Sequence, residues 1–397
     1  MKAITRTVWI LSVVSLLTDT ASEMLYPVMP LYLKSIGFSI VLIGILEGLA
    51  EATAGLSKGY FGKLSDHTGK RMPFVQWGYA LSAVSKPLMA LFVYPIWIFF
   101  VRTIDRLGKG LRTGARDAVL SDEATAATKG KVFGFHRSMD TLGAVIGPLF
   151  ALLYLKQHPN NYTALFYFAF LPGLLAVCCS LLLKDKNRKI DKSTDKIRFF
   201  SFLLYWKHSP LLYKKLVVGL LVFTLFNSSD VFLLLKAKQT GLHDSQIIAM
   251  YIFYNLIYAV FAFPIGMLAD KIGLRSIFLI GLSTFVIVYV GIATIKTEYL
   301  FYVLFFLYGI YAASTEGVSK AWISNITNKS DTATAIGTYS GFQSICTFLA
   351  STIAGLIWFK LGATATFLVT AMATLAVIIY ISFIPSTNKG PELGSWH

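Results

Sequence analysis

The sequence predicts an all-α polytopic membrane protein in which twelve transmembrane helices form two six-helix bundles. Its 397 residues are 55% hydrophobic and only 14% charged, and the mean hydropathy is +0.64. A soluble protein this apolar could not cover its own surface with polar groups. Runs of about 20 apolar residues recur along the chain, the length that an α-helix needs to cross a bilayer. One polar loop pattern occurs twice, half a chain apart, and indicates two related halves.

Twelve apolar segments are long enough to be the spans. They lie near residues 7–33, 39–58, 73–93, 96–117, 131–155, 162–183, 214–236, 245–266, 276–295, 299–323, 333–358 and 362–384. The first segment is too long for a cleavable signal and lacks a small-residue cleavage site. We expect residues 1–183 to form the first bundle, 184–213 a basic cytoplasmic linker with an amphipathic helix, 214–384 the second bundle and 385–397 a cytoplasmic tail.

The distribution of positive charge predicts the orientation in the membrane. The formal net charge of +16 lies mainly in loops and tails, above all in the run KDKNRKIDKSTDK of the linker. Placing both termini in the cytoplasm puts most of the loop Lys and Arg on the inner side, as the positive-inside bias requires. We therefore expect a multi-pass protein of the cell inner membrane. The same distribution excludes a concentrated binding surface for nucleic acid.

The stretch GYFGKLSDHTGKRMP, from Gly59 to Pro73, follows the second span directly. It places a glycine, an aspartate, a second glycine and two basic residues at spacings that return in the second half, where Leu274 replaces one basic residue. The two sets are Gly62, Asp66, Gly69, Lys70 and Arg71, and Gly266, Asp270, Gly273 and Arg275. The pattern resembles the signature loop of the major facilitator superfamily, G-x-x-x-D-R-x-G-R-R, with His67 at the first arginine. The resemblance covers essentially the full chain and implies a transporter whose two loops act in gating.

The fifth span contains a second pattern, G-x-x-x-G-P, at Gly143, Gly147 and Pro148. It resembles the core of the superfamily's antiporter motif, although the closing glycine pair is absent. Close helix packing through small residues is the alternative interpretation. The runs DRLGKGLRTGARDA and GFHRSMDTLGAVIGP resemble a little-characterised prokaryotic branch of the superfamily, which implies no particular substrate.

Five carboxylates in the spans are candidate proton-coupling residues. They are Asp19 and Glu23 in the first span, Glu47 and Glu51 in the second, and Asp140 in the fifth. Residues four apart share one face of a helix. A carboxylate beside another carboxylate in a low dielectric can bind a proton near neutral pH and release it when the cavity opens to water. The alternative is permanent pairing with cations of the fourth and fifth spans, because unpaired charge at membrane depth costs several kcal/mol.

The fourth span carries a continuous cationic stripe. Its charged residues advance in steps of three and four and so lie on one face: Arg102, Asp105, Arg106, Lys109, Arg112 and Arg116. Contact of this face with lipid is implausible. We expect Arg102, Asp105, Arg106 and Lys109 to bind substrate in a central cavity. Arg112 and Arg116 are expected to be structural, locked against Asp66 or Asp117.

Further substrate-binding candidates come from the fifth span and from the second half. They are Arg137, Tyr254, Asn255, Tyr258, Glu316, Lys320 and Gln343. The aromatic side chains have packing as their alternative role. Glu316 and Lys320 stand four apart and either satisfy each other or form a charge clamp opposite the fourth span.

The predicted function is secondary active transport by a monomer. The phosphate-binding pattern G-x-x-x-x-G-K-[ST] does not occur, so direct use of ATP is not expected. We expect no enzyme domain, no metal site and no cofactor. The proton gradient is the expected driving force. We predict proton-coupled export of a charged or zwitterionic small organic solute by alternating access. The alternatives are proton-coupled uptake of an organic anion, export of amphiphilic drugs or lipids, and a non-transporting receptor or channel.

Overall fold

The computed structural model describes residues 4–26, 28–38, 40–159, 161–185, 202–227, 230–242, 244–295 and 297–385. In these ranges the chain is helical and no strand occurs. The first half contains α1 (Arg6–Leu25), α2 (Met29–Ser35), α3 (Ile40–Thr68), α4 (Met72–Leu91), α5 (Pro95–Asp122), α6 (Lys129–Gln157) and α7 (Tyr162–Leu181). The second half contains α8 (Leu203–His208), α9 (Leu211–Phe226), α10 (Asp230–Gln239), α11 (Asp244–Ile272), α12 (Leu274–Thr294), α13 (Glu298–Asn325) and α14 (Thr332–Ser382).

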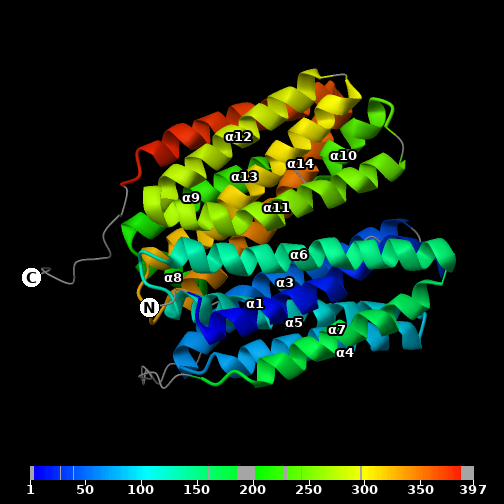
Figure 1. The fold of residues 1–397 in the computed structure, drawn as a ribbon, viewed down its shortest axis with the longest axis horizontal. Helices are drawn as coiled ribbons and strands as arrows, with labels where there is room; N and C mark the ends of the chain where they lie inside the picture. Colours follow the sequence, from blue (N-terminus) through cyan, green and yellow to red (C-terminus); the bar gives the residue numbers. More distant parts are fainter. Residues whose placement is uncertain are drawn as a thin grey trace, which may run out of the picture.

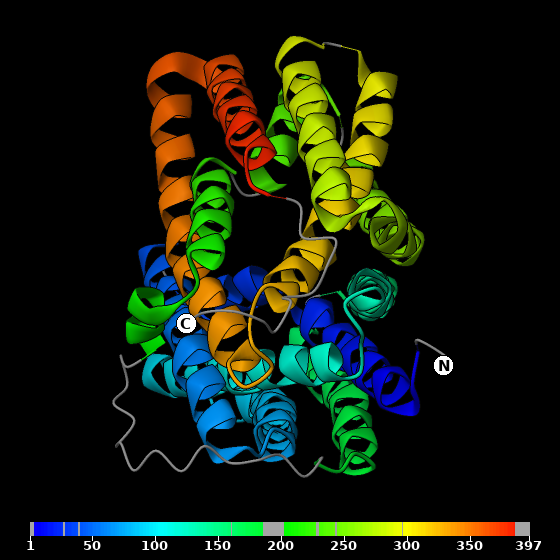
Figure 2. The same ribbon diagram turned by 90° about the vertical axis from the view of Figure 1, so that its left-hand side faces the viewer.

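The two halves form two helical bundles that lie against each other. In Figure 1 the bundle of α1–α7 lies below the bundle of α9–α14. Two pairs of helices make the main contact between them: α6 with α11, and α3 with α14. Figure 2 shows the molecule from its left-hand side, with one bundle above this contact and the other below it.

Apolar side chains cover the outside of the bundles, whereas charged side chains lie within them. Ile96, Phe359 and Phe383 are more than four-fifths exposed, but Arg116 and Asp117 of α5 are buried. This distribution is the one that a lipid environment requires. Among the described residues, seven helices are long and apolar enough to span a membrane by length and composition, and α5 is not among them. The stripe of charges on α5 explains its absence from that group.

Some predicted spans differ from the helices of the structure. The expected span 7–33 comprises α1 and α2, and the span 214–236 comprises α9 and α10. The last two predicted spans together make up α14, which is kinked at Gly362. The φ of this residue is 86°, a conformation that suits glycine. Of the expected linker, residues 186–201 lie outside the described ranges, so its amphipathic helix stays a prediction.

The stretch after the second predicted span is helical rather than a loop. Helix α3 continues past Lys58 to Thr68, and only residues 69–71 connect it to α4, with Gly69 at a φ of 67°. A helix of 29 residues is about 44 Å long, whereas the hydrocarbon core of a bilayer is about 30 Å thick. The last turns of α3, which carry Asp66, therefore lie beyond the apolar span.

Candidate substrate cavity and gate

The two bundles are in close contact at one end of the molecule, which we call the motif face. At this face α3 ends and α4 begins, and α1 begins and α14 ends there too, on the left in Figure 1. A methyl group on Gly62 would overlap the carbonyl oxygen of Ala333, and one on Gly266 would overlap that of Gly130. The helix pairs α3–α14 and α6–α11 thus touch backbone to backbone, as glycine at a crossing allows.

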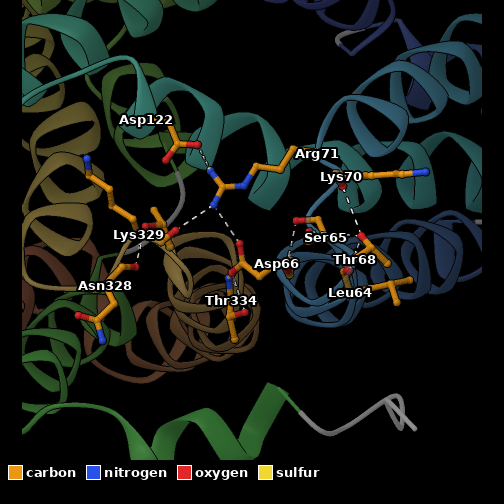
Figure 3. Close-up of polar contacts among 12 residues, drawn as sticks. Leu64, Ser65, Asp66, Thr68, Lys70, Arg71, Asp122, Asn328, Lys329 and Thr334 are labelled. Carbon is orange, nitrogen blue, oxygen red and sulfur yellow. Dashed lines mark hydrogen bonds and ion pairs between the residues drawn. The ribbon is translucent and has the colours of Figure 1, made fainter. Parts of the chain in front are cut away.

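Asp66 joins the first bundle to the start of α14 at the motif face (Figure 3). Its carboxylate accepts the backbone N–H of Thr334 at 2.7 Å and the Thr334 hydroxyl at 2.8 Å. Thr334 lies in the first turn of α14, where backbone N–H groups have no partner within the helix. Asp66 therefore acts as a cap supplied by the opposite bundle, favoured by the helix dipole.

Arg71 extends this contact into a network. One guanidinium nitrogen donates to Asp66 at 3.1 Å and to the carbonyl of Lys329 at 3.1 Å, and the other donates to Asp122 at 2.6 Å. The side chain of Arg71 is almost fully buried. Burial raises the pKa of Asp66 to about 6, although Arg71 and the Thr334 donors oppose that shift. The hydrogen bonds of Arg71 thus span both bundles.

The second copy of the loop makes a simpler contact. Asp270 accepts the backbone N–H groups of Gly130 and Lys131, both at 2.7 Å, and so caps the first turn of α6. Arg275 donates to the carbonyl of Ser382 within its own bundle. Gly273 precedes α12 with a φ of 100°. In the first copy, Lys70 is exposed.

A cavity separates the bundles away from the motif face. Its volume is about 930 Å³, and a narrower cavity of about 330 Å³ continues it, because both are lined by Glu23, Arg106 and Glu316. The wide cavity reaches Leu155 near the end of α6 and Ile247 near the start of α11, both remote from the motif face. The structure is thus sealed at the motif face and hollow toward the other end.

Most of the predicted site residues line the narrow cavity. They are Asp19, Glu23, Arg102, Asp105, Arg106, Lys109, Arg137, Asp140, Asn255, Tyr258, Glu316, Lys320 and Gln343. Tyr254 does not line it and packs instead behind Asp230. Glu47 and Glu51 have side chains outside the described part of the structure.

Tyr251 and Asp230 are among the lining residues that were missed as site candidates. Tyr251 lines both cavities, and its place one turn before Asn255 on the face of Tyr258 is a signal that could have found it. Asp230 lines the wide cavity. It is the sole carboxylate of its predicted span, but its position suggested a helix end rather than a site.

Several charges of the α5 stripe are neutralised by neighbouring helices. Asp105 accepts Lys86 of α4 at 2.9 Å and lies 3.6 Å from Arg102. Arg116 pairs with Asp117 at 3.0 Å, as expected. Arg112 pairs with neither expected aspartate.

The guanidinium of Arg112 binds α4 instead. It donates to the Ser82 hydroxyl at 2.7 Å and stands 4.7 Å from the ring centre of Tyr79. A hydroxyl and an aromatic face can hold a buried guanidinium without a carboxylate, so the charge pattern alone could not identify its partner.

Residues of α13 reach across to the first bundle. Glu316 lies 3.6 Å from Arg137, and Lys320 donates to Asp117 at 2.7 Å. These are the contacts of a charge clamp, and no ion pair joins Glu316 to Lys320 themselves within the described chain. Arg137 also pairs with Asp140 at 2.6 Å and donates to the hydroxyl of Tyr258.

Asp19 and Asp140 form a pair of carboxyl groups at the base of the cavity. Their side chains are within hydrogen-bonding reach of each other, and Asp140 also accepts the Ser15 hydroxyl. A hydrogen bond between two carboxyl groups requires a proton on one of them. The pair can therefore hold one proton beside the cations of the cavity.

Glycines of α6 bring these two carboxyl groups together. A methyl group on Gly147 would stand 2.5 Å from the carbonyl oxygen of Thr20, and one on Gly143 would stand 2.9 Å from the Thr20 nitrogen. The G-x-x-x-G pattern thus lets α6 approach α1 closely. Close packing, one of its two interpretations, is what the structure contains.

Comparison with known sequences places the chain in a family. The sequence profile described as Major Facilitator Superfamily matches residues 11–237 and 231–395. An MFS-type transporter of Methanocaldococcus jannaschii is 32% identical over 389 residues, which cover 96% of each chain. The staphyloferrin B transporter of Staphylococcus aureus is 33% identical over 130 residues, 32% of this chain and 31% of that protein. The quinolone resistance protein NorA of the same species is 24% identical over 41% of each chain.

Solved structures share the fold at low sequence identity. The human organic anion transporter MFSD10 (TETRAN) superimposes with a TM-score of 0.80 at 15% identity, covering 95% of this chain and 99% of that one. FucP, a transporter in the outward conformation, gives a TM-score of 0.76 at 11% identity, covering 97% and 100%. With its twelve-helix fold, its two copies of the loop pattern and the match along nearly its whole length, the chain belongs to the Major Facilitator Superfamily of transporters.

Proposed function

We propose that this transporter exports a charged or zwitterionic small organic solute in exchange for protons, by alternating access between the two bundles. One observation carries the proposal: a cavity between the bundles combines cations of α5 and α6 with a carboxyl pair that can hold a proton. The relevant groups are Arg106, Lys109 and Arg137 on one side and Asp19 with Asp140 on the other. No cofactor is needed, because the proton gradient supplies the driving force.

The cations suit the anionic part of such a solute. Lys109 is exposed to the cavity, and Arg106 and Arg137 line both the wide and the narrow cavity. A guanidinium binds a carboxylate or phosphate through two parallel hydrogen bonds. The similarity to the staphyloferrin B transporter supports a charged organic solute, as does the fold shared with an organic anion transporter. The similarity to the quinolone resistance protein NorA keeps drug export as an alternative.

The direction of coupling depends on the charge that the solute brings to the carboxyl pair. A solute that brings a cationic group into this cavity lowers the affinity of Asp19 and Asp140 for a proton, which couples export to proton entry. A purely anionic solute at Arg137, which pairs with Asp140 at 2.6 Å, would favour protonation of that carboxyl group. Proton and anion would then move together, so proton-coupled uptake is the second candidate.

Transport in proteoliposomes tests the coupling. Asp19→Asn should abolish solute accumulation driven by a pH gradient while leaving counterflow, because exchange of solute needs no net proton movement. Retained accumulation would move the assignment to Glu23, Glu47 or Asp140. A solute that only equilibrates, with no accumulation in the wild type, would indicate a channel.

Arg106→Lys tests the anion contact. The change keeps the charge but loses the guanidinium fork, so it should weaken binding by about 1–3 kcal/mol, the range of a charge-assisted hydrogen bond. The hypothesis of an anionic group on the solute would be rejected by two results together. These are equal affinity of Arg106→Lys and the wild type, and a thermal-shift screen in which only organic cations or amphiphiles bind.

We also propose that the protein is a monomer of the inner membrane with the motif face in the cytoplasm. Ser330 at the motif face and Thr297 at the other end are both exposed and form a matched pair for cysteine labelling. An impermeant thiol reagent should modify Thr297→Cys but not Ser330→Cys in intact cells. The reverse labelling would invert the orientation. Ser65 is unsuitable for this test because it is fully buried.

A further inference from the structure

Asp230 stands where the seventh predicted span is divided into α9 and α10. It begins α10 and lines the wide cavity. One carboxylate oxygen accepts the hydroxyl of Tyr308 at 2.6 Å, and the other accepts the hydroxyl of Tyr254. Two buried tyrosines on neighbouring helices therefore fix the carboxylate from behind.

The charge of Asp230 has no counter-charge in the described part of the protein. Asp105, Asp117 and Asp140 each pair with a Lys or Arg, whereas no ion pair to Asp230 occurs among the described residues. The N-terminus of α10 offsets only part of a negative charge. A carboxylate left unpaired at membrane depth costs several kcal/mol.

Aromatic rings line the cavity next to the two tyrosines that hold the carboxylate. Tyr251 and Tyr311 line the same cavity as Asp230. Their ring centres lie 5.4 Å from Tyr254 and 5.3 Å from Tyr308, the two residues that hold the carboxylate. Aromatic faces beside a carboxylate attract an organic ammonium group through the ring quadrupole as well as through charge.

Asn227 supplies an acceptor without a partner at the same place. Its amide nitrogen donates to the hydroxyl of Tyr311 at 3.0 Å, but its buried amide oxygen accepts no hydrogen bond. Asn227 lines the wide cavity together with Asp230. Buried acceptors are normally satisfied, and the N–H groups of an ammonium ion would satisfy this one.

We propose that Asp230, Asn227, Tyr251 and Tyr311 form a binding site for an organic ammonium group. The inference rests on the proposed function, which it sharpens: the solute is a zwitterion whose cationic end binds here. Its anionic end then faces Arg106, Lys109 and Arg137 of the first bundle across one cavity. Tyr251 lines this cavity together with both Glu23 and Asp230, so the two walls meet around it.

The lack of a counter-charge distinguishes Asp230 from Glu316, the other carboxylate of α9–α14 that lines the wide cavity. Glu316 already lies 3.6 Å from Arg137. The two carboxylates are therefore a matched pair, one compensated within the protein and one left for the ligand. A zwitterion bound in this way touches both bundles, and binding at both ends would couple their movement.

The experiment measures ligand binding to the purified full-length protein by calorimetry and thermal shift. The probes are 2-phenylethylammonium and the neutral 2-phenylethanol, which share one carbon skeleton. The ammonium probe should bind the wild type more tightly than the alcohol. Asp230→Asn should weaken ammonium binding by about tenfold or more, as loss of a charge-assisted contact predicts, and leave the alcohol unaffected. Glu298→Gln, at an exposed carboxylate of α13 outside the cavity, is the control and should retain ammonium binding. Glu316→Gln is measured beside it as the competing carboxylate of the cavity.

Two further variants guard against a folding defect in Asp230→Asn. Tyr254→Phe keeps the ring but removes a hydroxyl that holds Asp230, and Asn227→Leu removes the free acceptor. Each should weaken ammonium binding by a few-fold. Equal affinity of wild type and Asp230→Asn for the ammonium probe would overturn the proposal. So would loss of binding in Glu316→Gln alone, or equal affinity for the ammonium and the alcohol.

Binding and transport are separable in this design. If the ammonium probe fails to bind but an anion still accumulates under a pH gradient, the ammonium site is wrong and proton-coupled transport stands. If the probe binds through Asp230 but no solute moves with protons, the site stands and the proposed coupling fails.

Discussion

The two copies of the repeated loop pattern share one contact and differ in everything around it. Asp66 caps α14 of the second bundle, and Asp270 caps α6 of the first. Only in the first copy does an arginine take part in this contact. Arg71 donates hydrogen bonds to Asp66, Asp122 and the carbonyl of Lys329. In the second copy Leu274 replaces one basic residue, and Arg275 bonds within its own bundle.

The difference shows that a repeated sequence pattern need not produce a symmetric gate. A side-chain cap contributes about 0.5–2 kcal/mol, and each hydrogen bond to a charged group contributes about 1.5–3 kcal/mol. Both copies have the cap, whereas the network of charged hydrogen bonds belongs to the first alone. We call the backbone contacts at Gly62 and Gly266 the backbone seal, and we expect them to stabilise the closed motif face to a similar extent. The ionic contribution to closure should be concentrated around Arg71.

The largest effect should come from filling the backbone seal. Gly62→Leu should prevent α3 from closing on Ala333, and Gly266→Leu should prevent α11 from closing on Gly130, so both should stop transport. Spin-label distances across the motif face, measured in a cysteine-free background, should lengthen in both variants. A variant that still closes and transports would show that the contact in that copy is dispensable.

The next effect separates the copies. Asp66→Asn should leave the protein folded and able to bind solute but should slow transport, with closure of the motif face weakened by about 1–3 kcal/mol. Asp270→Asn should be milder, because its side-chain oxygen can still accept a backbone N–H and no arginine loses a partner. Transport rates of the two variants at equal expression give the comparison. A larger defect in Asp270→Asn would reverse the assignment of the dominant copy.

Substituting the arginines should sharpen the contrast at smaller amplitude. Arg71→Lys keeps the charge but cannot reach Asp66, Asp122 and the Lys329 carbonyl together, so transport should fall several-fold. Arg275→Lys should leave the rate near that of the wild type. Similar rates for Arg71→Lys and the wild type would mean that charge, and not the fork, holds the gate.

The smallest effect is a pH dependence of closure. The pKa of Asp66 is about 6 in the closed motif face because burial raises it, whereas a hydrated aspartate has its ordinary value near 3.9. The closed form thus binds the proton more tightly, and lowering the pH from 7 to 5 should favour closure by about 1 kcal/mol. Spin-label distances at both pH values test this, and Asp66→Asn should remove the dependence. Opening at pH 5 would instead show that the ionised pair with Arg71 dominates.

The fold was predictable because long apolar segments indicate helices that cross the bilayer. The ends of the helices were less predictable. Hydropathy falls at Lys58, yet α3 continues to Thr68, since a helix does not have to stop where the lipid does. The opposite error occurred at Asp230. The span looked continuous there, and the division into α9 and α10 places its carboxylate on the cavity.

The candidate site was predictable as a set of buried charges but not as a set of partners. Helical spacing placed Glu316 and Lys320 on one face, yet their choice of Arg137 and Asp117 depends on how the bundles meet. Likewise, spacing put Tyr251 and Tyr254 near one face without distinguishing them. Only the rotation of α11 in the bundle sends Tyr251 to the cavity and Tyr254 behind Asp230.

The backbone seal at the motif face has an electrical consequence. A cavity of about 930 Å³ carries solvent deep between the bundles, so little of the membrane voltage falls across it. The drop is then concentrated over the few turns around Gly62 and Gly266, where the helix backbones are in contact. A charge that crosses this short barrier experiences nearly the whole potential, about 2.3 kcal/mol for each 100 mV. The field is therefore strongest beside Asp66 and Arg71, the residues that join the two bundles at the motif face.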